Sequence, residues 1–179
     1  EHLDDLVTIR DRLAKGRHPA AVAELEKEIA RLRADPYCPA QLADFRWQVR
    51  AGKVTITKFV GKGRTVAVPQ WVEDKPVTGI GKEAFKGCST LERVLLPDGL
   101  TSLGSHAFLE CSSLKRIFIP RGITVIPERI FMGCAKLGHV ALPEGVTVIG
   151  PDAFNACHSL PSIKLPESLT VVGQGNFIY

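Results

Sequence analysis

The sequence predicts a repeat solenoid, mainly β with tight turns, and three observations support that prediction. Residues of the same type recur every 23 positions through the second half of the chain. Each copy contains a short alternating apolar stretch that ends at a proline, which is typical of a strand. Ordering one copy of 23 residues costs roughly 35 kcal/mol. A single copy cannot offset that cost, whereas stacked copies bury one another's apolar edges.

The composition is that of a globular protein. The chain has 179 residues, of which 45% are hydrophobic and 23% charged, so collagen-like and disordered classes are excluded. No apolar run approaches the ~18 residues of a membrane-spanning helix. The net charge is +4, and the excess lies mainly in residues 51–85, which carry 6 basic and 3 acidic side chains. We therefore expect neither a membrane span in this segment nor a broad nucleic-acid-binding face.

Residues 1–36 are predicted to form an N-terminal αα-hairpin. Leu3 and Leu6 begin one apolar helical face that Gly16 can end, and Pro19 can open a second helix that stops before Pro36. Three roles stay open for this hairpin. It is an extra cap on the solenoid, a remnant of a larger upstream region, or a dimerisation helix pair. Self-association is expected through these helices or through the ends of the solenoid.

Residues 37–85 are predicted to form a β-hairpin cap and a first, divergent repeat. Residues 45–49 and 54–56 alternate apolar and polar side chains on either side of a turn at Ala51-Gly52. Residues 66–69 resemble a first repeat strand, and a 5-residue insertion follows them. A terminal repeat needs such a cap, because otherwise the apolar end of the core meets water.

Residues 86–179 are predicted to form leucine-rich repeats of 23 residues, the last copy incomplete. Glycine, threonine, leucine and proline each hold columns at this spacing. Phenylalanine and cysteine, preceded by alanine in most copies, form a tight turn that packs inward. The predicted core ladder consists of two columns: Phe85, Phe108, Phe131, Phe154 and Phe177, and Cys88, Cys111, Cys134 and Cys157.

These columns resemble the BspA-like leucine-rich-repeat family of bacterial surface and secreted proteins. The resemblance rests on the Ile-Gly-x-x-Ala-Phe-x-x-Cys-x-x-Leu motif and the Leu-Pro or Ile-Pro pair, and it covers roughly residues 45–179. The third copy departs from the motif at Pro127 and Ile130, and the fifth at Asn176. It implies a right-handed coil with one strand per turn on one face. It also implies adhesion and protein binding without catalysis, at the cell surface or after secretion. A cytoplasmic location stays open.

The cysteine column is expected to be structural. Zinc sites favour close pairs such as Cys-x₂-Cys, which the sequence lacks. Stacked strands would place successive cysteines about 4.8 Å apart, within the range that a disulfide permits. In-register residues point the same way, however, which suits packing better than bonding. We therefore predict reduced core thiols, and neither a metal site nor a cofactor; fewer than five free thiols on the denatured, non-reduced chain would overturn this.

The outward strand positions are the predicted binding surface. Strand alternation turns two columns of each repeat strand away from the core. The two columns are Arg93, Arg116, His139 and Ser162, and Leu95, Phe118, Ala141 and Lys164. Arginine and exposed phenylalanine are enriched in interface hot spots. The alternative is that these are solvated strand residues with no function, because scattered apolar side chains are normal on surfaces.

The sequence predicts no catalytic residue. Its five histidines share no motif, and Gly79-Ile80-Gly81-Lys82 lacks the remainder of a phosphate-binding loop. The predicted function is a non-catalytic protein–protein interaction module. It would act in adhesion or in host or partner binding through the outward strand surface, with an unidentified protein ligand. The alternative is an intracellular scaffold or regulatory repeat domain attached to an effector region.

Overall fold

The computed structural model describes residues 42–177, so the predicted αα-hairpin of residues 1–36 lies outside the described part. The chain divides into two compact units, Glu1–Pro39 and Ala40–Tyr179, and all the structure described below belongs to the second. The predicted domain boundaries after residues 36 and 85 stay predictions.

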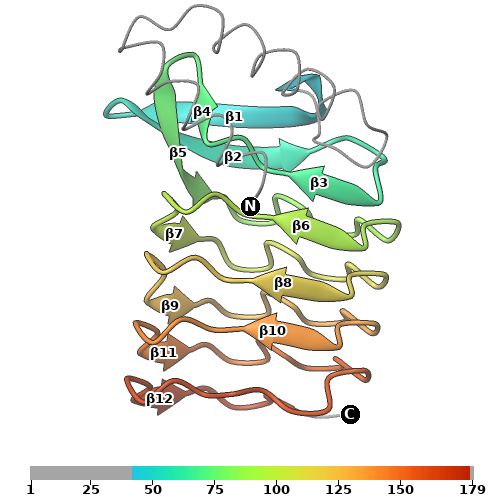
Figure 1. Ribbon diagram of the computed structural model, residues 1–179. Coiled ribbons are helices and arrows are strands. Elements are labelled where there is room, and N and C mark those ends of the chain that lie inside the picture. The colour runs from blue at the N-terminus through green and yellow to red at the C-terminus, as the bar shows by residue number, and fades with distance from the viewer. Residues whose placement is uncertain (1–41, 178–179) are drawn as a thin grey trace, which may run out of the picture. The chain divides into compact units, whose positions relative to one another are not determined.

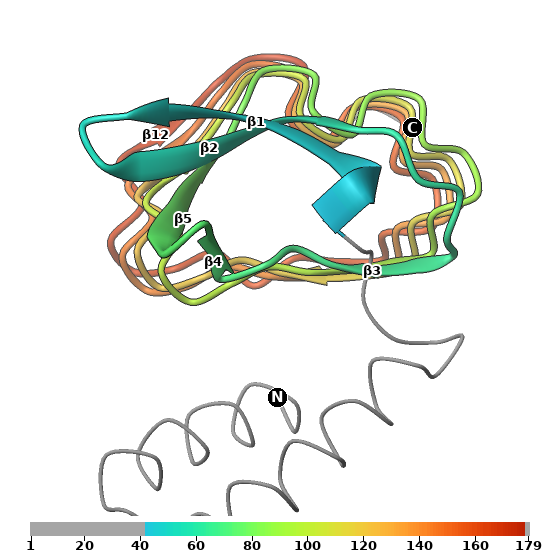
Figure 2. The ribbon, with the colours of Figure 1, turned by 90° about the horizontal axis from the view of Figure 1, so that it is seen from above.

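The N-terminal cap is a β-hairpin, as the alternation predicted. A short 3₁₀ turn, η1 (Leu42–Asp44), leads into β1 (Phe45–Arg50), which pairs antiparallel with β2 (Lys53–Phe59). The connecting residues Ala51 and Gly52 both have positive φ, at 48° and 72°, which matches the right-handed twist of a two-residue hairpin. Seen from above, the hairpin lies across the end of the stacked turns (Figure 2).

The predicted insertion forms a second small hairpin. The repeat strand β3 (Thr65–Ala67) is followed by β4 (Trp71–Val72), which pairs antiparallel with β5 (Lys75–Ile80). Strand β5 also pairs in parallel with β2 and β7, so it joins the cap to the first regular turn. The insertion therefore extends the sheet at the start of the solenoid.

The remaining turns stack as two columns of short parallel strands (Figure 1). One column is the sheet β10-β8-β6-β3; in the other, β7 pairs with β5, and β12-β11-β9 form a three-stranded sheet. Equivalent residues 23 positions apart lie in register, for example His139 beside Arg116 and Val148 beside Val125. The bounds are β6 (Arg93–Leu95), β7 (Ser102–Leu103), β8 (Arg116–Phe118), β9 (Val125–Ile126), β10 (His139–Ala141), β11 (Val148–Ile149) and β12 (Val171–Val172).

A stack of phenylalanine rings runs through the core. The rings of Phe85, Phe108, Phe131 and Phe154 are fully buried, with successive centroids 5.0–5.6 Å apart and planes within 22° of parallel. Offset stacking at this separation is favourable beyond the burial of area alone. The cap completes the stack, because Phe59 lies 5.3 Å from Phe85 by ring centroids. Phe177 continues it at 5.7 Å from Phe154 but is only half-buried.

Close approach of neighbouring turns explains the glycine column. A Cβ atom at Gly104 would lie 2.3 Å from the backbone nitrogen of Lys82, and one at Gly173 would lie 2.4 Å from that of Pro151. A side chain at either of these two positions would force the turns apart locally, so glycine is required there, although the third copy has Pro127 at the equivalent position. The amides of these glycines also donate to the preceding turn, from Gly104 to Ile80 O and from Gly173 to Ile149 O, each at 2.7 Å.

The fifth copy departs from the predicted strand. Residues 161–166 form no strand in the structure, although the corresponding residues of the earlier copies do. In those copies the residue before the strand donates its amide to the preceding turn, as Lys115 does to Glu92 O and Gly138 to Lys115 O. Pro161 occupies this position in the fifth copy and has no N–H to donate. The predicted strand positions of Ser162 and Lys164 are therefore wrong.

Candidate protein-binding face

The outward side of β6, β8 and β10, hereafter the strand face, holds six of the eight predicted binding residues. They are Arg93, Leu95, Arg116, Phe118, His139 and Ala141. The middle residue of each strand is buried, and the residues on either side of it point outward, as alternation requires. Two of the outward residues are large and apolar: Leu95 is 42% exposed and Phe118 is 54% exposed.

Two arginines lie side by side on the strand face. Arg93 and Arg116 are register partners in the parallel strands β6 and β8, so their backbones are about 4.8 Å apart. Both side chains are exposed, and within residues 42–177 neither forms an ion pair. Like charges directly opposite each other on neighbouring strands are destabilising. The face therefore concentrates positive charge that the described residues do not neutralise.

A three-residue ion-pair network borders the arginines. Glu92 accepts hydrogen bonds from the guanidinium of Arg64 and, at 2.7 Å, from Lys115 Nζ. These hydrogen bonds hold the pKa of the Glu92 carboxyl at about 2, well below its usual range. Glu92 was missed by the sequence reasoning, although opposite charges 23 positions apart at Glu92 and Lys115 are a signal that such a pair stacks.

Aromatic and apolar side chains form the second column of the strand face. The Phe118 ring lies 5.6 Å from the imidazole of His139, with the planes tilted by 59°. Leu95 and Ala67 are register partners, and so are Ala141 and Phe118. The apolar column thus runs parallel to the charged column, two residues further along each strand.

The structure does not bring Ser162 and Lys164 into this sheet. Both residues are exposed, but they lie after Pro161 in a segment without strand pairing. Lys164 Nζ is 3.9 Å from Glu144 Oε1, and both side chains are largely exposed. An exposed pair of this kind contributes little to stability.

The cysteine column lies inside the solenoid. Cys111, Cys134 and Cys157 are buried, Cys88 is half-buried, and all four are free thiols. The buried thiols donate to carbonyls of the preceding turn: Cys111 to Phe85 O, Cys134 to Phe108 O and Cys157 to Phe131 O, at 3.0–3.2 Å. Burial raises the pKa of Cys134 well above its usual range and that of Cys157 to about 12. These thiols therefore pack as neutral core groups.

The second strand column carries a threonine ladder and a valine row. Thr147 and Thr170 each donate a hydroxyl hydrogen bond to the carbonyl of the threonine one turn earlier, at 3.2 and 3.0 Å. Val125 and Val171 are exposed, whereas Val148 is half-buried. Valine and threonine favour strands on packing grounds alone, so this side offers a chemically uniform surface.

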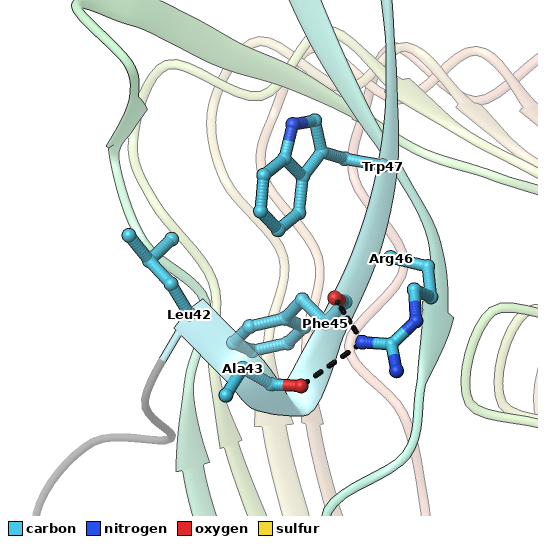
Figure 3. A pocket seen from close by; sticks show the side chains of 5 residues that line it. All are labelled: Leu42, Ala43, Phe45, Arg46 and Trp47. Carbon is cyan, nitrogen blue, oxygen red and sulfur yellow. Dashed lines mark hydrogen bonds between the residues drawn. The ribbon is translucent and has the colours of Figure 1, made fainter.

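A shallow depression lies beside the cap. It is lined by Leu42, Ala43, Phe45, Arg46 and Trp47 (Figure 3). Arg46 Nη1 donates to Ala43 O at 3.0 Å and to Phe45 O at 2.9 Å, so backbone carbonyls hold its guanidinium. None of the five lining residues is a carboxylate, an imidazole or a nucleophile.

The histidines and acids of the described part do not converge. No group of three or more His, Cys, Asp or Glu side chains in residues 42–177 is placed to hold a metal ion. His106 is half-buried, and its Nδ1 is buried without a hydrogen-bond partner in the described part of the chain. His158 is exposed. None of the helices that the structure describes has the length and apolar character needed to cross a membrane.

Comparison with known proteins shows the kind of repeat. Residues 70–179, more than half of the chain, match the BspA-type leucine-rich repeat region in six copies. A leucine-rich repeat protein of T. pallidum is 34% identical in sequence and superimposes with a TM-score of 0.74, covering 77% of this chain and 65% of that one. A leucine-rich repeat protein of Bacteroides ovatus is 26% identical with a TM-score of 0.64, covering 75% and 37%.

This chain therefore spans less than two thirds of the length of both solved neighbours. A search of curated protein sequences gave no match. The mainly-β solenoid with its phenylalanine and cysteine columns, the matching family model and the solved neighbours agree with one another. The chain belongs to the BspA-type leucine-rich repeat family.

Proposed function

We propose that this protein is a non-catalytic protein-interaction module that binds its partner through the strand face. One observation supports this most directly. The outward positions of β6, β8 and β10 combine arginine, an exposed phenylalanine and an exposed leucine, whereas the interior positions repeat nearly unchanged. Arginine and aromatic side chains dominate the binding energy of protein interfaces. Repeat solenoids also offer extended surfaces that bind partners.

The membership in the BspA-type family supports a role in binding at the outside of a cell. We place the protein at the cell surface or in secreted form, where it would take part in adhesion or in binding a host or partner protein. Immunogold labelling of intact, unpermeabilised cells that express the full-length gene checks this location. Labelling only after permeabilisation would instead favour an intracellular scaffold attached to an effector region.

Site-specific cross-linking tests the strand face itself. A photo-reactive amino acid replaces Leu95 on the strand face in one preparation and Val125 on the other strand column in a second. Both residues are exposed and apolar, so neither replacement removes a core contact. We expect the partner to be trapped from position 95 and not from position 125.

The trapped partner then allows a quantitative test. Arg116→Ala with Phe118→Ala is expected to weaken its binding by at least about 100-fold, since two hot-spot side chains are lost. Val125→Ala with Val171→Ala is the matched control and should bind like the wild type. The circular dichroism spectrum should be unchanged in both double variants, because all four substituted residues are exposed. Equal affinity of the two double variants, or cross-linking from position 125 alone, would refute the proposed face.

A further inference from the structure

The strand face contains a like-charge pair that the described residues leave unneutralised. Arg93 and Arg116 lie in register on adjacent parallel strands, about 4.8 Å apart. Cross-strand repulsion of this kind lowers stability. A bound anion between the two guanidinium groups would remove the repulsion and add charge-assisted hydrogen bonds.

The acidic residue directly before Arg93 in the sequence already has two cationic partners. Glu92 directly precedes Arg93 in the chain, but its carboxylate accepts hydrogen bonds from Arg64 and Lys115. Its two oxygens are thus directed at the neighbouring cations of the bordering network. Arg93 and Arg116 stay available to a ligand from outside the described residues.

The apolar column beside the arginines determines which other chemical group the ligand must have. Leu95 and Phe118 are each two residues beyond an arginine on the same strand, which corresponds to roughly 7 Å along the strand. Both are exposed. A ligand that contacts both columns must therefore present acidic groups and an apolar group within one short segment.

We propose that the strand face binds an acidic peptide segment of a partner protein, in which carboxylates flank an aromatic or aliphatic side chain. This rests on the proposed function of the strand face as a protein-binding surface. The planar guanidinium groups of Arg93 and Arg116 would each pair bidentately with a carboxylate. The apolar side chain of the peptide would pack on Phe118 and Leu95.

The same observations favour a peptide over a polyanion. Nucleic acids and sulfated glycans are bound by many cations spread along the ligand, and their affinity is dominated by that charge. The strand face instead places two arginines, without an ion-pair partner among residues 42–177, beside a row of exposed apolar residues. Interfaces between proteins combine arginine with aromatic and apolar side chains in this way.

Two synthetic peptides test the proposal by NMR titration of the full chain. The first is acetyl-Gly-Glu-Phe-Glu-Leu-Glu-Gly-amide, and the second has glutamine in place of each glutamate. We expect the acidic peptide to shift the backbone amide signals of β6 and β8. The glutamine peptide should bind at least about tenfold more weakly, because its charge-assisted hydrogen bonds are lost. Absence of shifts with the acidic peptide at millimolar concentration would overturn the proposal.

Variants with matched charge change locate the binding. Arg93→Gln with Arg116→Gln should weaken binding of the acidic peptide at least about tenfold. Lys53→Gln with Lys82→Gln removes the same charge from exposed lysines elsewhere and should leave the affinity within about twofold. All the substituted residues are exposed, so unchanged circular dichroism is expected and confirms that each variant folds.

The outcomes separate this proposal from the proposed function. If the arginine variant keeps full affinity for the trapped partner while Leu95→Ser with Phe118→Ser loses it, the acidic partner is refuted and the binding face survives. If neither pair of substitutions weakens partner binding, both fail. A heparin hexasaccharide that binds wild type and the Leu95→Ser, Phe118→Ser variant equally, and more tightly than the peptide does, would overturn the peptide in favour of a sulfated glycan.

Discussion

The interior columns and the strand face of this solenoid follow opposite rules at the same 23-residue spacing. In the interior, phenylalanine recurs in every turn and its rings stack in nearly parallel planes. On the strand face, equivalent positions change from arginine to histidine and from leucine to phenylalanine to alanine. A buried position must fill the same space in each turn. The residue type at an exposed position is not limited by packing, so it can vary from turn to turn to suit a binding partner.

The largest expected effect tests the interior side of this contrast. Phe131→Ala removes a fully buried ring that stacks on Phe108 and Phe154, and should lower the free energy of unfolding by about 3–5 kcal/mol. Phe118→Ala, the matched substitution on the strand face, should lower it by about 1 kcal/mol or less, because the ring is more than half exposed and its aromatic contact is with His139 at the surface. Urea unfolding followed by circular dichroism measures both. Equal losses in the two variants would mean that the contrast does not hold.

A smaller effect is expected where the backbones of neighbouring turns meet. Gly104→Ala should lower the free energy of unfolding by about 1–3 kcal/mol, because the added Cβ would lie 2.3 Å from Lys82 N. Gly99→Ala is the control, since its Cβ would meet nothing closer than Val77 O at 3.8 Å. A wild-type unfolding midpoint for Gly104→Ala would show that the turns are spaced more loosely than the structure has them.

The smallest expected effect concerns Glu92 beside the strand face, whose contribution to the free energy of unfolding should depend on pH. The folded protein holds the pKa of Glu92 at about 2, below its usual value of 4.5. A lowered carboxyl pKa contributes stability that is complete above pH 4.5 and is lost as the pH falls toward 2. The stability difference between wild type and Glu92→Gln should therefore shrink across this range. Urea midpoints at pH 6, 4, 3 and 2 measure it, and a constant difference would contradict the ion-pair network.

The repeat period made much of the fold predictable. It set the pairing register of the strands, the inward direction of Phe85 and its equivalents, and the outward direction of Arg93 and Phe118, because stacking places residues 23 apart on one column. The cap hairpin followed from its alternation and its turn residues. The loss of the strand at residues 161–166 could also have been predicted from the sequence, since proline cannot donate the amide hydrogen bond that starts each strand.

Other features of the structure depend on contacts between residues that are not 23 positions apart. The cap residue Phe59 joins the ring stack from outside the 23-residue series. Arg64 reaches Glu92 across 28 positions, and a 5-residue insertion hides their common column. Whether two outward arginines are paired or free depends on where every neighbouring carboxylate points.

The sequence alone determined the solenoid, because a repeated pattern of apolar residues can be buried only by stacking one copy on the next. It also determined which side chains face the core and which face out. Only the tertiary structure decided that Glu92 is engaged by Arg64 and Lys115 while Arg93 and Arg116 stay unpaired within the described residues. The physical reason is that burial follows from the one-dimensional period, whereas pairing of charges depends on three-dimensional distances of a few ångströms.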